Sequence, residues 1–189
     1  MTTVINLYGG PGTGKSTAAT GVFSKLKTAG VNCEYVNEYA KEITWEGTQA
    51  LLENQLHVFA EQTRRQWRLN KKVDYIITDS PLPLAVVYMR HYNQHYKTFS
   101  PAYVDLTEKY FLATFDQFTN WNFVICRNKR YVTAGRNQTE EQAKVIDSDI
   151  EQLLLSNKIP HVYTNSVNAI EDILFAIEHP SLYQSRVIK

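Results

Sequence analysis

The sequence contains one segment that constrains the fold more strongly than any other: Gly9, Gly10, Pro11, Gly12, Thr13, Gly14, Lys15, Ser16 and Thr17 in succession. The pattern G-x-x-x-x-G-K-[ST] is complete from Gly9 to Ser16. An apolar, strand-like run precedes the segment and a helix-like run follows it, which is the context that this motif requires. We therefore interpret the segment as a phosphate-binding loop between the first strand and the first helix.

Each residue type in this loop has a physical task. Glycines allow positive φ angles and leave backbone N–H groups free to surround an anionic phosphate. The helix that begins near Lys15 adds the positive end of its dipole. In loops of this kind the lysine reaches the β- and γ-phosphates and the serine hydroxyl, here Ser16, binds Mg²⁺. The loop predicts binding of ATP or a related nucleoside triphosphate with Mg²⁺.

Strand-like and helix-like runs alternate along the chain, which predicts an α/β fold: a three-layer αβα domain with a five-stranded parallel sheet. The expected strands are Val4–Tyr8, Val31–Val36, Val73–Thr78, Asn122–Cys126 and His161–Thr164. The expected helices are Ala18–Lys27, Tyr39–Ile43, Thr48–Asn70, Leu82–Tyr92, Pro101–Phe118, Thr139–Leu155 and Val167–Glu178. Thr139 and Gln142 have the spacing of a capping box at the start of the sixth of these helices.

Length and composition limit the alternatives. A chain of 189 residues that is 43% hydrophobic suits a single domain, residues 1–189, and leaves too little chain for a separate helical lid domain. The net charge of +1 provides no overall attraction to nucleic acid or membranes. Cys33 and Cys126 both fall in strand-like runs, where buried free thiols are common, and they indicate a reducing compartment. No apolar run is long enough to span a bilayer, so we expect a cytoplasmic protein.

In a parallel sheet, ligands bind at the carboxyl ends of the strands, and two carboxylates stand there. Asp79 follows the third strand as a Mg²⁺ ligand or substrate contact would, although an Asx turn before Pro81 is the simpler alternative. Glu38 follows the second strand and is a candidate general base, or else a first-turn residue that complements a helix dipole. Ser80 occupies the position where hydrolytic motors usually have a glutamate, which disfavours a motor.

Positive charge gathers after the fourth strand. Residues 117–139 contain no Asp or Glu but include Arg127, Lys129, Arg130 and Arg136. Guanidinium groups match phosphate geometry and stabilise the charge that spreads over the transferred phosphoryl group. We expect residues 127–138, approximately, to form an arginine-bearing lid that closes over the triphosphate. A solvated basic loop is the alternative.

Together, these features resemble the P-loop kinases of nucleosides and nucleotides over nearly the whole chain. The segment from Arg127 to Ala143, with Gly135, Arg136 and Asn137, resembles more narrowly a group of small phage-encoded P-loop kinases, often labelled AAA-type ATPases. Members of that group phosphorylate hydroxymethyluracil within DNA. The resemblance implies Mg²⁺- and ATP-dependent phosphorylation with Glu38 or Asp79 as the base, in host cytoplasm if the chain is phage-encoded. Nucleoside kinases usually carry arginine beside the third-strand carboxylate, where this chain has Ser80.

The acceptor is a nucleoside, a nucleotide or a base in modified DNA. Aromatic residues such as Tyr39 and Tyr88 are candidates for stacking a base, and Arg64 or Arg65 for binding an acceptor phosphate. Arg64, Arg65, Arg68, Lys71 and Lys72 form a basic strip that suits a DNA backbone or simply a solvated helix end. A nucleotide-hydrolysing switch is a lesser alternative. No membrane partner is expected, and the sequence is compatible with a monomer or a homodimer.

Overall fold

The computed structural model describes residues 2–128, 131–132 and 138–188, apart from the side chain of His95. Its centre is a five-stranded sheet in the order β2-β3-β1-β4-β5, and every pairing is parallel. The strands are β1 (Thr3–Tyr8), β2 (Cys33–Val36), β3 (Tyr75–Thr78), β4 (Thr119–Cys126) and β5 (Val162–Asn165). The predicted five-stranded parallel sheet is confirmed.

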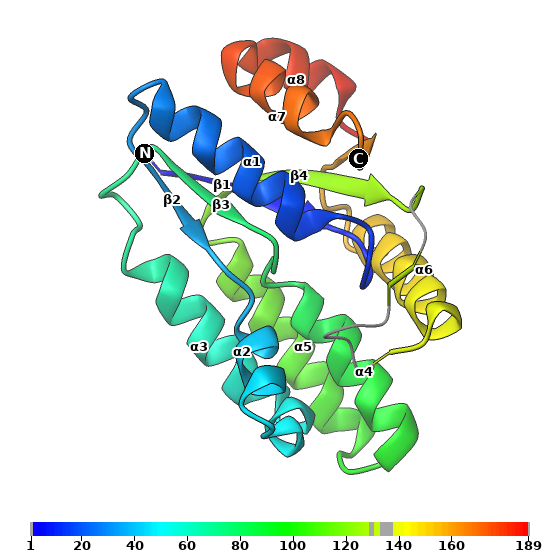
Figure 1. Ribbon diagram of the computed structural model, residues 1–189. Coiled ribbons are helices and arrows are strands. Elements are labelled where there is room, and N and C mark those ends of the chain that lie inside the picture. The colour runs from blue at the N-terminus through cyan, green and yellow to red at the C-terminus, as the bar shows by residue number, and fades with distance from the viewer. Residues whose placement is uncertain (1, 129–130, 133–137, 189) are drawn as a thin grey trace.

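Helices cover both faces of the sheet (Figure 1). They are α1 (Lys15–Thr28), α2 (Tyr39–Trp45), α3 (Gln55–Trp67), α4 (Leu84–Tyr96), α5 (Pro101–Phe115), α6 (Glu140–Ser156), α7 (Ala169–Glu178) and α8 (Pro180–Arg186), with a short 3-10 helix η1 (Gln49–Glu53). Strand β1 shows how the two layers form, because its side chains alternate between faces. Val4 and Tyr8 join the core under α3 to α6, whereas Ile5 and Leu7 join the core under α1, α7 and α8.

The sheet brings the ends of its strands to one edge. Strand β1 lies between β3 and β4, so the chain leaves it at the point where the strand order reverses. The register pairs Asn6 of β1 with Thr78 of β3 and pairs Val36 of β2 with the same Thr78. Since all strands are parallel, the segments that follow them meet at this edge, where ligands bind in open α/β sheets.

The single long helix predicted over Thr48–Asn70 is wrong. The segment is divided into η1 and α3, and Asn54 lies between them with φ −87° and ψ 78°. The Asn54 side chain accepts a hydrogen bond from the backbone N–H of His57 at 3.2 Å. The Asn54 side chain thus caps the N-terminus of α3 and interrupts the helix that would otherwise continue from residue 48. The spacing of apolar residues, on which the prediction was based, does not reveal this local hydrogen bond.

Other local predictions are confirmed or corrected. The capping box of Thr139 and Gln142 is present at the start of α6. Cys33 is buried, but Cys126, at the end of β4, is exposed, and both thiols are free. In the described part of the chain, no helix has the length and apolar character to cross a membrane.

Candidate active site

The phosphate loop has the backbone that its sequence predicts. Gly9, Gly12 and Gly14 adopt φ angles of 140°, 88° and 100°, which residues with a Cβ rarely adopt. A Cβ on Gly9 would lie 2.6 Å from Thr13 Oγ1 and 3.0 Å from the carbonyl oxygen of Ile125. Glycine is therefore required here both for its backbone conformation and for the close approach of β4.

Side chains of the loop fold back on the carbonyl oxygen of Gly10. Lys15 Nζ donates a hydrogen bond to this oxygen at 3.0 Å, and Thr13 Oγ1 donates to it at 3.1 Å. Helix α1 begins at Lys15, directly after the left-handed Gly14. The loop therefore holds its lysine beside the first turn of a helix, as a triphosphate site requires.

A cavity of about 360 Å³ opens from this loop. At one end it is lined by Pro11, Gly12, Gly14, Lys15, Ser16 and Thr17. At the other end the wall is mostly apolar, aromatic and amide in character; it includes Trp45, Leu52, Gln55, Val58, Phe59, Gln62, Leu84, Ala85, Tyr88 and Tyr92. One continuous space thus joins a phosphate-binding end to an end suited to a neutral ring system.

Glu38 lines the same cavity as the phosphate loop and the aromatic and amide wall. It occupies the N-cap position of α2, yet its side chain makes no capping hydrogen bond. Burial, together with the negative charge of Glu38, raises the pKa of the half-buried Tyr88 phenol. Burial, Tyr96 and Glu38 raise the pKa of Tyr92 to about 12. The Glu38 carboxylate therefore lies close enough to the aromatic wall of the cavity to influence the ionisation of two of its phenols.

Asp79 lies deeper than Glu38. It directly follows β3 and is only 2% exposed, whereas the next residues, Ser80 and Pro81, line the cavity. Its Oδ1 has no hydrogen-bond partner among the described residues. Burial and the charge and hydrogen bond of Asp79 raise the pKa of Tyr35. A buried carboxylate oxygen without a partner suits a bound cation or an ordered water.

These residues fit Mg²⁺. The described part of the chain holds no cluster of His, Cys, Asp and Glu that would form a metal centre from protein groups alone. Mg²⁺ in phosphoryl-transfer sites is typically held by one or two protein oxygens together with substrate phosphates and water. The Ser16 hydroxyl in the cavity wall and the buried Asp79 carboxylate are protein oxygens of the kind that would hold such an ion.

Arg127 is linked to the phosphate loop through Asp147, a residue of α6. Its Nε donates to Asp147 Oδ2 at 2.7 Å, and the other oxygen of Asp147 accepts the Gly10 N–H at 2.6 Å. Arg127 Nη1 is buried without a partner among the described residues, and it lies 3.2 Å from the position that a Cβ on Gly12 would take. The Tyr131 ring lies 5.8 Å from the guanidinium carbon. Arg127 is therefore held beside the loop by a carboxylate of α6, and its role as a lid cation stays a prediction.

Sequence reasoning did not find Asp147. It lies in the middle of α6, in a pattern of alternating apolar and charged residues that is typical of any amphipathic helix. Its role depends on how α6 docks against the loop, which no local signal encodes. Arg130 and Arg136, the other predicted lid cations, lie outside the described residues.

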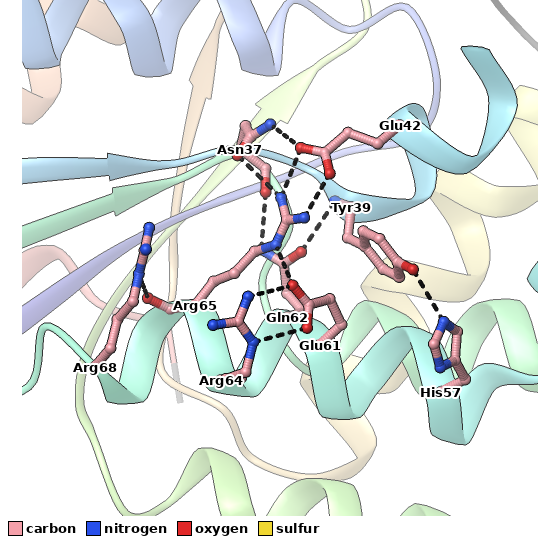
Figure 2. A network of polar contacts seen from close by, with 9 residues as sticks. All are labelled: Asn37, Tyr39, Glu42, His57, Glu61, Gln62, Arg64, Arg65 and Arg68. Carbon is pink, nitrogen blue, oxygen red and sulfur yellow. Dashed lines mark hydrogen bonds and ion pairs between the residues drawn. The ribbon is translucent and has the colours of Figure 1, made fainter. Parts of the chain in front are cut away.

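Of the four residues predicted to bind the acceptor, one lines the cavity and three do not. Tyr88 lines the cavity, but Tyr39, Arg64 and Arg65 do not. Arg64 forms two hydrogen bonds with Glu61, of 2.8 and 2.7 Å, and Arg65 is paired with both Glu42 and Glu61 (Figure 2). Tyr39 directs its hydroxyl to His57 Nε2 at 2.9 Å. Gln62, which the sequence did not single out, does line the cavity.

The fold and the loop define a P-loop nucleotide-binding protein. A family model described as an AAA domain matches residues 4–171, and the chain therefore belongs to this family of AAA domains. No curated protein sequence matches the chain.

Solved structures share the fold. Deoxyadenosine kinase from M. mycoides with bound dATP matches with a TM-score of 0.61 and 17% identity, over 93% of this chain and 99% of that chain. The NadR protein in complex with NAD and AMP-PNP matches with a TM-score of 0.63 and 16% identity, over 90% of this chain and 49% of that chain. The chain thus corresponds to about half of NadR. The three-layer architecture with its parallel sheet is that of P-loop kinases.

Proposed function

We propose that the protein is a kinase that transfers the γ-phosphate of ATP to a hydroxyl of a nucleoside-type acceptor. The observation that carries this proposal is a single cavity lined by the phosphate loop, by an aromatic and amide wall and by the Glu38 carboxylate. A hydrolase needs only room for water beside the γ-phosphate. A space of this size, largely lined by neutral groups, favours a second substrate. The shared fold with deoxyadenosine kinase agrees with this choice.

The charges around the acceptor end favour an uncharged acceptor. Arg64 and Arg65, the predicted ligands of an acceptor phosphate, are paired with glutamates and lie off the cavity. Among the described residues that line the cavity, the positively charged side chains are Lys15 and the exposed Lys41. The negative charge of Glu38 in the same lining offsets one of these two charges. A monophosphate acceptor would bring two negative charges beside this carboxylate, without a guanidinium fork to bind them. We therefore favour a nucleoside over a nucleotide.

In this proposal each site residue has a separate role in phosphoryl transfer. Lys15 and the loop N–H groups bind the β- and γ-phosphates, and Glu38 accepts the proton of the attacking hydroxyl. Ser16 and Asp79 would hold Mg²⁺, which when bound would supply positive charge to the phosphates. Arg127 adds positive charge beside the loop, and Arg130 and Arg136 remain candidates for the same task.

A base in DNA is the second acceptor class, suggested by the narrower resemblance to phage kinases. Its predicted phosphate contacts are weakened by the structure, because Arg64 and Arg65 already have carboxylate partners. One experiment separates the classes. The protein is incubated with γ-labelled ATP and Mg²⁺ against nucleosides, nucleoside monophosphates and DNA that contains hydroxymethyluracil.

We expect label on nucleosides, little on monophosphates or DNA, and loss of transfer by Lys15→Ala with the fold intact. Label in DNA alone, with a steep dependence on salt, would replace the nucleoside by a DNA base. Release of labelled phosphate with every acceptor left unlabelled would contradict a kinase, as would full activity of Lys15→Ala.

A further inference from the structure

The short link between β2 and α2, residues 37–39, carries the proposed base at its centre. Helix α3 holds the backbone of this link on both sides of Glu38. Gln62 Nε2 donates to the carbonyl oxygen of Asn37 at 3.2 Å, and Gln62 Oε1 accepts the N–H of Tyr39 at 3.1 Å. The Gln62 side chain itself is buried, at 4% exposed, and both of its hydrogen bonds are partly buried. One buried amide thus fixes the peptide groups before and after Glu38.

Arg65, three residues after Gln62 on the same helix, contacts the side chains of Asn37 and Tyr39 in this link. Its guanidinium binds both carboxylate oxygens of Glu42, at 2.7 and 2.5 Å, and donates to Asn37 Oδ1 at 3.2 Å (Figure 2). The guanidinium carbon also lies 4.8 Å from the centre of the Tyr39 ring. Asn37 Nδ2 donates to the same Glu42 at 2.6 Å, which closes the network.

This network is more than a surface ion pair. The Arg65 side chain is 13% exposed, and its Nε is bound by Glu61 at 3.1 Å. Hydrogen bonds from Arg64, and then from Arg65, lower the pKa of Glu61 to about 2. A planar fork that engages two carboxylates, an amide and an aromatic face has one geometry, which lysine cannot reproduce.

We propose that Arg65 and Gln62 are positioning residues that hold Glu38 at the distance and angle needed to accept a proton from the acceptor. The inference rests on the proposed function. Glu38 is the central residue of a three-residue link whose two outer residues, Asn37 and Tyr39, are held by α3. A displacement of about 1 Å at a catalytic group costs about 100-fold in rate, so fixing the neighbours of the base matters for turnover.

A purely structural network would make a different prediction. If these contacts only attach α2 to α3, their loss lowers stability and leaves the rate per folded molecule unchanged. If they position Glu38, their loss lowers kcat while ATP affinity is kept, because the phosphate loop belongs to another part of the cavity.

The test uses Arg65→Lys, which keeps the charge, and Asn37→Ala, whose exposed side chain can be removed without opening the core. The matched control is Arg90→Lys, which disturbs an ion pair between Arg90 Nη2 of α4 and both carboxylate oxygens of Glu108 of α5, a pair that includes no residue of the link. We expect kcat to fall at least about tenfold in Arg65→Lys and to stay near wild type in Arg90→Lys, with ATP affinity within about twofold in both.

A double-mutant cycle identifies the residue through which Arg65 acts. In a Glu38→Gln background, Arg65→Lys should cause no further loss of kcat, because the group that it positions is gone. Unchanged kcat in Arg65→Lys, or an equal loss with and without Glu38, would overturn the proposal. If no acceptor is phosphorylated by the wild type, the proposed function fails instead.

Hydrogen exchange gives a readout that does not depend on turnover. Because Gln62 accepts the Tyr39 N–H, this amide should exchange faster in Arg65→Lys and in Asn37→Ala than in wild type or Arg90→Lys. An exchange rate that does not change in either variant would show that the link is held without Arg65, and would overturn the proposal even for an inactive protein.

Discussion

At the level of single residues, Asp147 joins the phosphate loop to α6. One carboxylate oxygen accepts the Gly10 N–H, and the other accepts from Arg127. The carbonyl oxygen of the same Gly10 holds Lys15 and Thr13. Displacing Gly10 would therefore disturb the lysine that binds the triphosphate.

We expect Asp147→Ala to lower the free energy of unfolding by about 1–3 kcal/mol, because it leaves the largely buried Arg127 and a loop N–H unpaired. It should also weaken ATP binding through the displaced Lys15. Urea unfolding and a binding titration measure the two effects. Asp149→Ala, on the same helix, is the control. Stability and ATP affinity equal to wild type in Asp147→Ala would contradict this role.

At the level of elements, α3 organises the acceptor side of the site. Its inner face lines the cavity with Gln55, Phe59 and Gln62. Beside this face Arg65 contacts the link after β2 and is itself paired with Glu61 of the same helix. The break at Asn54 sets where this helix begins and therefore which side chains face the cavity. A helix that continued from residue 48 without this break would lack the Asn54 cap that fixes the first residue of α3.

The ion pairs of α3 predict an acid-sensitive step in stability. The pKa of Glu61 is lowered from 4.5 to about 2, first by its hydrogen bond to Arg64. A carboxyl whose pKa is depressed in the folded state stabilises fully above its unfolded pKa, and this contribution is lost as the pH falls from about 4.5 to about 2. Unfolding midpoints in urea across that range should fall less for Glu61→Gln than for wild type. Parallel curves for the two proteins would contradict the assignment.

At the level of the whole molecule, the sequence predicts the features that are local and repeated. Alternating runs predict the parallel sheet, and the polar residues that follow each strand predict Glu38, Asp79 and Arg127 at one edge, because parallel strands bring their ends together. The loop glycines predict their own backbone.

Partners across elements were not predictable in the same way. The pairing of Asp147 with Gly10, and of Arg65 with Glu42, depends on how α6 and α3 dock against the sheet. Arg64 and Arg65 look like phosphate ligands in the sequence, although Glu61 stands three and four residues before them, which is the spacing of ion pairs within a helix; only Glu42 becomes a neighbour of Arg65 through the fold. Helix α8 was missed, since its short run after Pro180 has little apolar periodicity.

The central claim is that one cavity brings a bound triphosphate and an acceptor hydroxyl to Glu38. The most direct test is transfer of the γ-phosphate of labelled ATP to a nucleoside by wild type and by Glu38→Gln, with ATP binding measured for both. We predict a labelled nucleoside with wild type and a rate about 10²–10⁴-fold lower with Glu38→Gln, at unchanged ATP affinity. Equal rates for the two proteins, or labelled phosphate released only to water, would contradict the claim.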